Sequence, residues 1–134
     1  MAEDCIFCRI VSGNVPSYNV YEDADFIGFL DIRPLTRGNC LLIPKKHYHW
    51  TYEVPNFGEY FEAARKIGLA AQKAFGAEWV CFLTLGLEVP HAHIRVIPRY
   101  KQDLHGIVVD INKWETFPGE EMKEIAAKIA AELE

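Results

Sequence analysis

The spacing of apolar residues changes along the chain, and each spacing predicts a different element. Residues 57–75 carry apolar side chains every three or four positions, which is typical of a helix with one buried face. Gly76 comes next and is a typical helix end. A second one-sided pattern follows Pro118 and predicts another helix as far as residue 133. A short helix is also predicted over 5–12.

Shorter apolar runs between turn residues predict strands. Two early strands are joined by a link too short for a parallel crossover, so they are expected to pair antiparallel. Strands before and after one long helix indicate an α+β domain with a mainly antiparallel sheet. The sequence has no repeat or flexible linker, which indicates one domain over residues 1–134. The predicted strands cover residues 19–22, 26–32, 39–43, 78–85 and 91–97.

The composition of the chain excludes some classes of protein function. The chain has 134 residues, is 50% hydrophobic, and carries a formal charge of −5, which argues against a sequence-independent nucleic-acid binder. Its longest unbroken apolar stretch, Trp79 to Leu83, is far short of the roughly 20 residues that cross a bilayer. The first residues, MAEDCIFC, lack the features of a signal peptide, so the four cysteines are expected to be reduced or metal-bound in the cytoplasm.

The most informative segment is PHAHIRVIPR, residues 90–99. On a strand, His91, His93 and Arg95 would point to one face and form a ladder suited to an anion such as phosphate. A neutral imidazole can also attack phosphorus, and cationic neighbours can stabilise the charge on the transferred group. The alternative is that these residues are ordinary exposed polar positions on a strand.

Cys5 and Cys8 form a CxxC pair near the start. Such a pair supplies two of the four ligands of a structural zinc ion, and histidines later in the chain could supply the others. A redox pair would normally follow a strand of a βαβ unit, which is not predicted here, and two idle thiols are the third reading. Cys40 and Cys81 lie in apolar runs and are expected in the core.

Asp31 closes an apolar run in the segment FLDIRP. Its carboxylate could accept hydrogen bonds from a ribose diol. The alternative is that it initiates the turn before Pro34. The segment PKKHYHW, residues 44–50, adds basic and aromatic groups but by itself indicates only a polar loop.

Together these segments resemble the histidine triad (HIT) family of nucleotide-binding proteins. The resemblance is carried by CIFCRI, VYED, FLDIRP, GNCLLIPKKH and GLEVPHAHIRVIPR, and it covers nearly the whole chain. It implies a single histidine triad domain of α+β fold. This fold has a five-stranded, mainly antiparallel sheet, a long central helix and a C-terminal helix. It also implies a homodimer in which the long helix and a strand meet across the two-fold axis.

The resemblance implies a nucleotide hydrolase or nucleotidyl transferase. Enzymes of this family act at the α-phosphate of nucleoside phosphoramidates, adenylated compounds or dinucleoside polyphosphates, so the expected partner is a purine nucleotide or its conjugate. His93 would be the nucleophile and would form a nucleotidyl-histidine that water resolves. His91 and His47 would orient the phosphate site.

The resemblance also assigns the nucleotide and metal sites residue by residue. Asp31 would bind the ribose, and the base would be held between four apolar side chains, Phe7, Ile10, Phe29 and Ile32. Gly86 and Glu88, from the loop before the histidines, would complete the nucleotide site. Zinc would be bound by Cys5, Cys8, His47 and His91.

Three departures from the family pattern bear on activity. Arg95 stands where a third histidine is expected, and an arginine can attract a phosphate but cannot lend a proton to a leaving group. The loop over 83–90 looks shortened and lacks the usual glutamine and asparagines, while Glu88 puts a negative charge near an anionic substrate. Asn39 also replaces a histidine common in the family.

Three hypotheses follow. The first is a zinc-containing hydrolase or transferase that uses His93. The second is a nucleotide-binding or regulatory module that has lost most catalysis, which Arg95 and Glu88 motivate. The third is a hydrolytic metal centre, which is disfavoured because four protein ligands would close the coordination shell.

Overall fold

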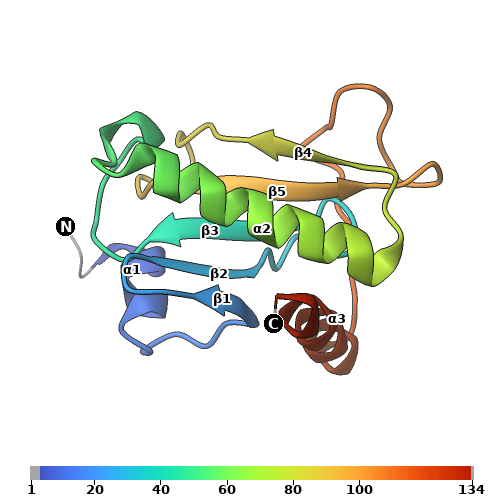
Figure 1. Ribbon diagram of the computed structural model, residues 1–134, viewed down its shortest axis with the longest axis horizontal. Coiled ribbons are helices and arrows are strands. Elements are labelled where there is room, and N and C mark those ends of the chain that lie inside the picture. Colours follow the sequence, from blue (N-terminus) through green and yellow to red (C-terminus); the bar gives the residue numbers. More distant parts are fainter. Residues whose placement is uncertain (1–3, 134) are drawn as a thin grey trace.

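A computed structural model describes residues 4–133 and shows an α+β architecture (Figure 1). One five-stranded sheet is flanked by helices on both faces, with the long helix α2 lying across the face toward the viewer. In chain order the elements are α1 (Ile6–Val11), β1 (Asn19–Glu22), β2 (Phe26–Leu30), β3 (Cys40–Pro44), the 3-10 helix η2 (Thr51–Glu53), α2 (Phe57–Phe75), β4 (Trp79–Leu83), β5 (Ile94–Arg99) and α3 (Gly119–Glu132).

The sheet has the order β1-β2-β3-β5-β4, and every neighbouring pair is antiparallel. This confirms the predicted α+β fold. Strand β3 is central: Leu42 lies opposite Gly28 of β2 on one side and opposite Ile94 of β5 on the other. Strand β4 forms one edge of the sheet, beside β5.

All five residues of β2 are buried, because both faces of the sheet are covered. Phe26 and Leu30 pack into the large core under α2 and α3, whereas Ile27 and Phe29 pack with Phe7 of α1 on the opposite face. The period of two in the strand thus divides its side chains between two cores. The second core is where α1 is attached to the sheet.

Helix α2 has the predicted bounds, and Gly76 ends it with a left-handed φ of 67°. Two features of the sequence bring the helix close to the sheet. The Tyr60 hydroxyl donates a hydrogen bond to the Leu42 carbonyl over 2.9 Å. A side chain at Gly28 would place its Cβ only 2.8 Å from Cδ1 of Ile67, so the absence of a side chain lets the helix pack at this distance.

Some sequence predictions were wrong in detail. Strand β5 begins at Ile94 rather than at residue 91, because His91 and His93 lie in the segment that leads into it. Cys40 is buried as predicted, but Cys81 is only half-buried because it lies on the edge strand β4. No helix among residues 4–133 is long and apolar enough to span a bilayer.

The irregular segment after β5 is organised by a buried ion pair. Arg99 Nε donates to Asp103 Oδ2 over 2.8 Å, and the two side chains are almost fully buried. The backbone N–H groups of Tyr100 and His105 donate to the same carboxylate over 2.8 and 3.0 Å. Burial alone would raise the pKa of Asp103, but these hydrogen bonds outweigh it and the pKa is lowered. The ionised carboxylate therefore holds the start of this segment.

We expect Asp103→Asn to reduce the free energy of unfolding at pH 7 by about 3 kcal/mol, because it leaves the Arg99 charge buried without its partner. Since the folded state lowers the pKa of Asp103, this stabilisation is present above the ordinary value of 3.8 and is lost as the pH falls through the lower folded value. Urea unfolding of both proteins from pH 7 down to pH 2 measures this difference. The difference in free energy of unfolding between the two proteins should become smaller toward pH 2.

Asp110→Asn is the matched control, since Asp110 is exposed and its carboxylate accepts one hydrogen bond, from the Asn112 N–H. Its effect should stay within about 0.5 kcal/mol. Equal effects of the two substitutions would contradict the role given to the ion pair.

Candidate functional site

A cavity of about 310 Å³ lies between α1, the end of β2 and the start of β5. Its apolar wall includes Ile6, Phe7 and Ile10 from α1 and Phe29 from β2. Its ionisable groups are one histidine, two arginines and two carboxylates, namely His93, Arg33, Arg95, Asp31 and Glu88. An apolar slot that ends in a few convergent charged groups is typical of a small-molecule site.

His93 is 4% exposed, and its ring orientation is fixed by the backbone. Its Nδ1 lies 2.8 Å from the His91 carbonyl oxygen, which can only accept, so Nδ1 carries the proton. Nε2 is therefore the nitrogen with the free lone pair. Burial lowers the pKa of His93, which favours the neutral ring, although the bond to His91 opposes this effect. The arrangement suits a nucleophile.

Asp31 and Arg95 form a loose, largely buried ion pair in the cavity. Arg95 Nη1 lies 3.8 Å from Asp31 Oδ2, and Nη2 lies 3.7 Å from Glu88 Oε1. Burial raises the pKa of Asp31, opposed by the Arg33 N–H that donates to it and by the nearby positive charges. These groups give the cavity a polar end next to His93.

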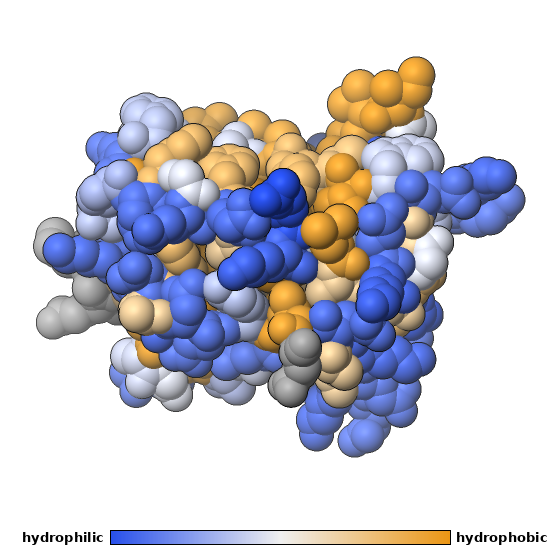
Figure 2. Space-filling model, in the orientation of Figure 1, coloured by the Kyte–Doolittle hydropathy of each residue, from blue (hydrophilic) through white to orange (hydrophobic). Residues whose placement is uncertain are grey.

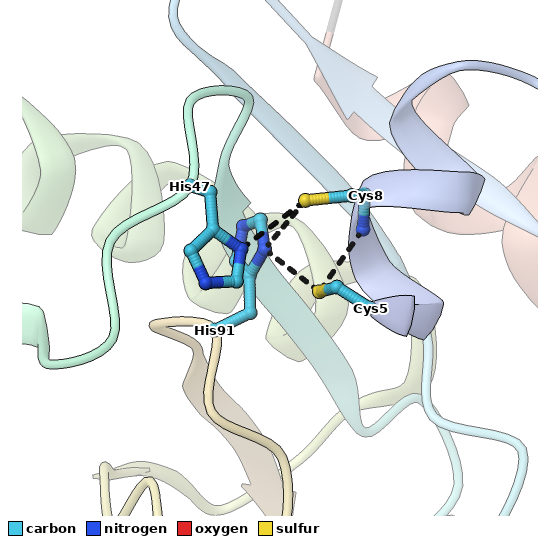
Figure 3. Close-up of side chains that lie close together, drawn as sticks. All are labelled: Cys5, Cys8, His47 and His91. Atoms are coloured by element: carbon cyan, nitrogen blue, oxygen red, sulfur yellow. Dashed lines mark hydrogen bonds between the residues drawn. The ribbon is translucent and has the colours of Figure 1, made fainter. Parts of the chain in front are cut away.

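A cluster of two cysteines and two histidines lies beside the cavity (Figure 3). Figure 3 shows Cys5, just before α1, and Cys8, within α1, pointing toward His47 and His91. Cys5 Sγ lies 3.2 Å from His91 Nδ1, and Cys8 Sγ lies 3.2 Å from His47 Nδ1. All four potential ligand atoms lie within 4.8 Å of one another.

The donor set fits a zinc ion. Zn–S and Zn–N bonds of about 2.3 and 2.0 Å in a tetrahedron put ligand atoms about 3.3–3.8 Å apart, close to the observed Cys–His separations. His91 Nε2 donates to the Pro44 carbonyl over 2.9 Å, which leaves Nδ1 bare toward the two sulfurs. Burial raises the pKa of Cys8 to about 11, so its thiolate needs a nearby cation. These four residues could hold zinc in a closed, structural shell.

In the structure, His91, His93 and Arg95 do not form the single ladder that the sequence predicts. His93 and Arg95 line the cavity, but His91 is not among the lining residues and faces the cysteines instead. Pairing of β5 with β3 extends only to Ile94. The segment before Ile94 is instead bound to the loop after β3, because the Ala92 N–H donates a hydrogen bond to the Tyr48 carbonyl. The strand alternation assumed from the sequence therefore does not extend to His91.

Most predicted nucleotide-binding residues are brought together at the cavity, and one is not. The residues that line it are Phe7, Ile10, Phe29, Asp31, Ile32 and Glu88. Gly86 lies outside: it has φ of 84°, packs against Trp50, and its carbonyl accepts a hydrogen bond from His49. Gly86 thus shapes the loop that carries Glu88 rather than lining the cavity.

Sequence reasoning missed a third wall of the cavity. Ile111, Asn112 and Trp114 line it, and the Arg33 guanidinium lies 5.4 Å from the centre of the Trp114 ring. This segment has no periodic pattern that places it. An isolated tryptophan in a polar stretch was the one available signal.

Comparison with known proteins identifies the family. The family model described as the HIT domain matches residues 12–102, which contain all five strands and α2. The chain belongs to the HIT family. Cys5 and Cys8 lie just outside the matched range, whereas His47, His93 and Arg95 lie inside it.

Individual HIT proteins resemble this chain over nearly its full length. It is 38% identical to Protein hit of Bacillus subtilis, over 98% of this chain and 96% of that protein. The crystal structure of a Zn-bound histidine triad family protein from Mycobacterium smegmatis superposes with a TM-score of 0.81 at 30% identity, covering 99% of this chain and 95% of that one.

Two HIT relatives are named for reactions of nucleotides. Adenosine 5'-monophosphoramidase HNT1 of Saccharomyces cerevisiae is 32% identical over 93% of this chain and 82% of that protein. Adenylylsulfatase HINT3 of Arabidopsis thaliana is 34% identical over 77% of this chain, which matches 56% of that protein. HIT relatives of this chain thus include nucleotide hydrolases.

Proposed function

We propose that this HIT protein is a nucleotide hydrolase or nucleotidyl transferase that acts at the α-phosphate through His93. The observation that carries the proposal is the orientation of His93, whose Nδ1–H is held by the His91 carbonyl and whose Nε2 lone pair is left free in a cavity that also contains Arg95. The named activities of the relatives HNT1 and HINT3 support the same reaction class.

The proposed reaction has two displacements. Nε2 of His93 attacks the α-phosphorus, the bond to the leaving group breaks, and a nucleotidyl-histidine forms. Water then attacks phosphorus, the P–N bond breaks, and a nucleoside monophosphate is released. Arg95 stabilises the negative charge of the transferred group, and the apolar wall around Phe7 and Phe29 holds a purine base. The Asp31 carboxylate, which lines the cavity, would accept hydrogen bonds from the ribose.

We propose in addition that the four-residue cluster binds one zinc ion with a structural role. The donor geometry supports this, as does the zinc-bound relative from Mycobacterium smegmatis. Such an ion would attach α1, and with it Phe7 and Ile10, to the segment that carries His93. Free thiols available to a metal also fit the proposed cytoplasmic location.

We propose, finally, that the chain folds as one domain and pairs as a homodimer through β4. This edge strand exposes Trp79 and Phe82, which are 46% and 44% exposed. Figure 2 shows apolar surface gathered along this edge of the molecule. Two such strands can pair and continue the sheet across a two-fold axis, which hides the apolar edge.

The second candidate function is a nucleotide-binding module with little catalysis. Glu88 favours it, because its carboxylate lies 3.7 Å from Arg95 Nη2 and would compete with an incoming phosphate. A binding module and an enzyme would both bind a nucleoside monophosphate, so turnover measurements are needed to distinguish the two functions.

His93→Ala should reduce kcat/KM for release of AMP from adenosine 5′-phosphoramidate or diadenosine tetraphosphate by at least about 1,000-fold, because the nucleophile is removed. AMP release is followed by chromatography, and AMP affinity by calorimetry. The affinity should change little.

His49→Gln is the matched control, because His49 contacts Trp50 and the Gly86 carbonyl outside the cavity. It should retain most of the activity. If wild-type protein binds AMP but releases none from either substrate above the His93→Ala level, the binding module is the correct function.

For the metal, we expect purified wild-type protein to contain one zinc ion per chain by plasma mass spectrometry, and Cys8→Ser to contain almost none. Removing the ion with a chelator should also lower the melting temperature, since the ion binds only the folded state. Cys81→Ser, at a half-buried thiol on β4, is the control and should keep its zinc. Equal zinc content in both variants would exclude this cluster as the site.

For the dimer, Phe82→Glu should convert the protein to monomers in sedimentation experiments, because it puts a charge into the proposed apolar edge. Ala127→Glu, at an exposed position of α3, is the control and should leave the assembly unchanged. A wild-type protein that sediments as a monomer at all concentrations would contradict this proposal.

A further inference from the structure

Arg95 has hydrogen-bonding capacity that the folded chain does not use. Its side chain is 12% exposed, and its two ion pairs, at 3.8 Å to Asp31 and 3.7 Å to Glu88, are longer than hydrogen bonds. The buried Nε has no hydrogen-bond partner among residues 4–133. Because a buried donor without a partner is costly, we infer that a ligand completes the contacts of this guanidinium.

The position of Arg95 indicates which part of a substrate it would contact. His93 and Arg95 are two residues apart where the chain enters β5, and both line the cavity, so their Cα atoms lie roughly 6–7 Å apart along it. In an in-line attack on an α-phosphorus in front of His93, the leaving group lies on the side of the phosphorus away from Nε2. We infer that the Arg95 guanidinium extends past the transferred phosphate to this leaving group.

The two carboxylates differ in how firmly they are held. Asp31 is largely buried and accepts a hydrogen bond from the Arg33 N–H over 3.0 Å. The Glu88 side chain is 69% exposed, so it can turn into solvent when an anion arrives. The vacated side of the guanidinium then presents a planar pair of N–H donors, which matches an oxyanion.

We propose that Arg95 selects substrates whose leaving group is an oxyacid anion, such as sulfate or a phosphate chain, and discriminates against amine leaving groups. This inference rests on the proposed reaction at His93. It concerns the class of substrate, nucleoside 5′-phosphate anhydrides in preference to phosphoramidates.

The bond changes explain the selection. When His93 Nε2 attacks an anhydride, the P–O bond breaks, its electron pair goes to the leaving oxygen, and the sulfate or phosphate departs as an anion without needing a proton. When it attacks a phosphoramidate, the P–N bond breaks and the nitrogen must gain a proton to leave as ammonia. A guanidinium keeps its protons at physiological pH and cannot supply one. The other ionisable groups in the cavity are Arg33, with the same limitation, and the two carboxylates that face Arg95.

The test compares kcat/KM for three substrates, adenosine 5′-phosphosulfate, diadenosine tetraphosphate and adenosine 5′-phosphoramidate, in wild type, Arg95→His and Arg95→Gln. Because anhydrides are intrinsically more reactive than phosphoramidates, the decisive quantity is how each variant changes the ratio. Arg95→His should raise phosphoramidate turnover about 100-fold by introducing a general acid, and should lower anhydride turnover about 10-fold. Arg95→Gln should lower anhydride turnover similarly without improving phosphoramidate turnover. The two anhydrides show whether sulfate or a phosphate chain is preferred.

A binding measurement gives a readout besides turnover. Calorimetry with inorganic sulfate, at AMP concentrations that saturate each variant, should detect sulfate binding to wild type and a loss of at least about 10-fold in sulfate affinity in Arg95→Gln. His49→Gln, which lies outside the cavity, is the control and should bind sulfate as wild type does. Glu88→Gln should instead raise kcat/KM for the phosphosulfate about fivefold by removing the competing carboxylate.

The selection by Arg95 is overturned if Arg95→His leaves the anhydride-to-phosphoramidate ratio unchanged while His93→Ala abolishes both reactions. In that case the proposed function survives alone. If wild type turns over none of the three substrates, the proposed function itself fails, and the inference with it.

Discussion

The candidate site depends on the hydrogen bonds of one buried imidazole, that of His91. Its Nε2–H is held by the Pro44 carbonyl at the end of β3, which turns Nδ1 toward the sulfurs of Cys5 and Cys8. Its backbone carbonyl accepts the Nδ1–H of His93 and thereby fixes the nitrogen that faces the cavity. His91 thus determines both the ligand geometry of the cysteine–histidine cluster and the tautomer of His93. Its ring is fully buried and cannot adopt another orientation without breaking these contacts.

The arrangement also explains why a helix of six residues can form a wall of the cavity. A helix as short as α1 has little stability of its own. It is attached to the sheet by Phe7, which packs edge-on against Phe29 and against the rings of His91 and His93, and by the two cysteines of the cluster. The same helix presents Ile6 and Ile10 to the cavity. Loss of the cluster would therefore disturb the apolar wall before it disturbs the sheet, whose core under α2 is separate.

Sequence patterns predicted the fold well because its main elements bury one face against a large core. The bounds of α2 follow from its long amphipathic pattern, and the buried runs of β2 and β3 identify them as strands. Prediction failed where contacts distant in sequence override local alternation, as at His91, whose partners lie in α1 and the loop after β3. It also missed Trp114, since its position depends on a long irregular segment organised by the Arg99–Asp103 pair. The edge exposure of Cys81 depends on strand order, which composition alone does not give.

The charged end of the cavity is a poor arrangement for stability. A buried arginine flanked by carboxylates at 3.7–3.8 Å gains less from the ion pairs than a well-packed apolar residue gains from burial. Its unsatisfied Nε adds a further cost of about 1–3 kcal/mol. Such an arrangement is understandable where a ligand supplies the missing acceptors. The four side chains of the cysteine–histidine cluster point toward one another, so a metal ion bound by all four would have no open position for a substrate. We therefore assign the proposed chemistry in the cavity to His93 and the charges around it, with the guanidinium of Arg95 beside the departing group.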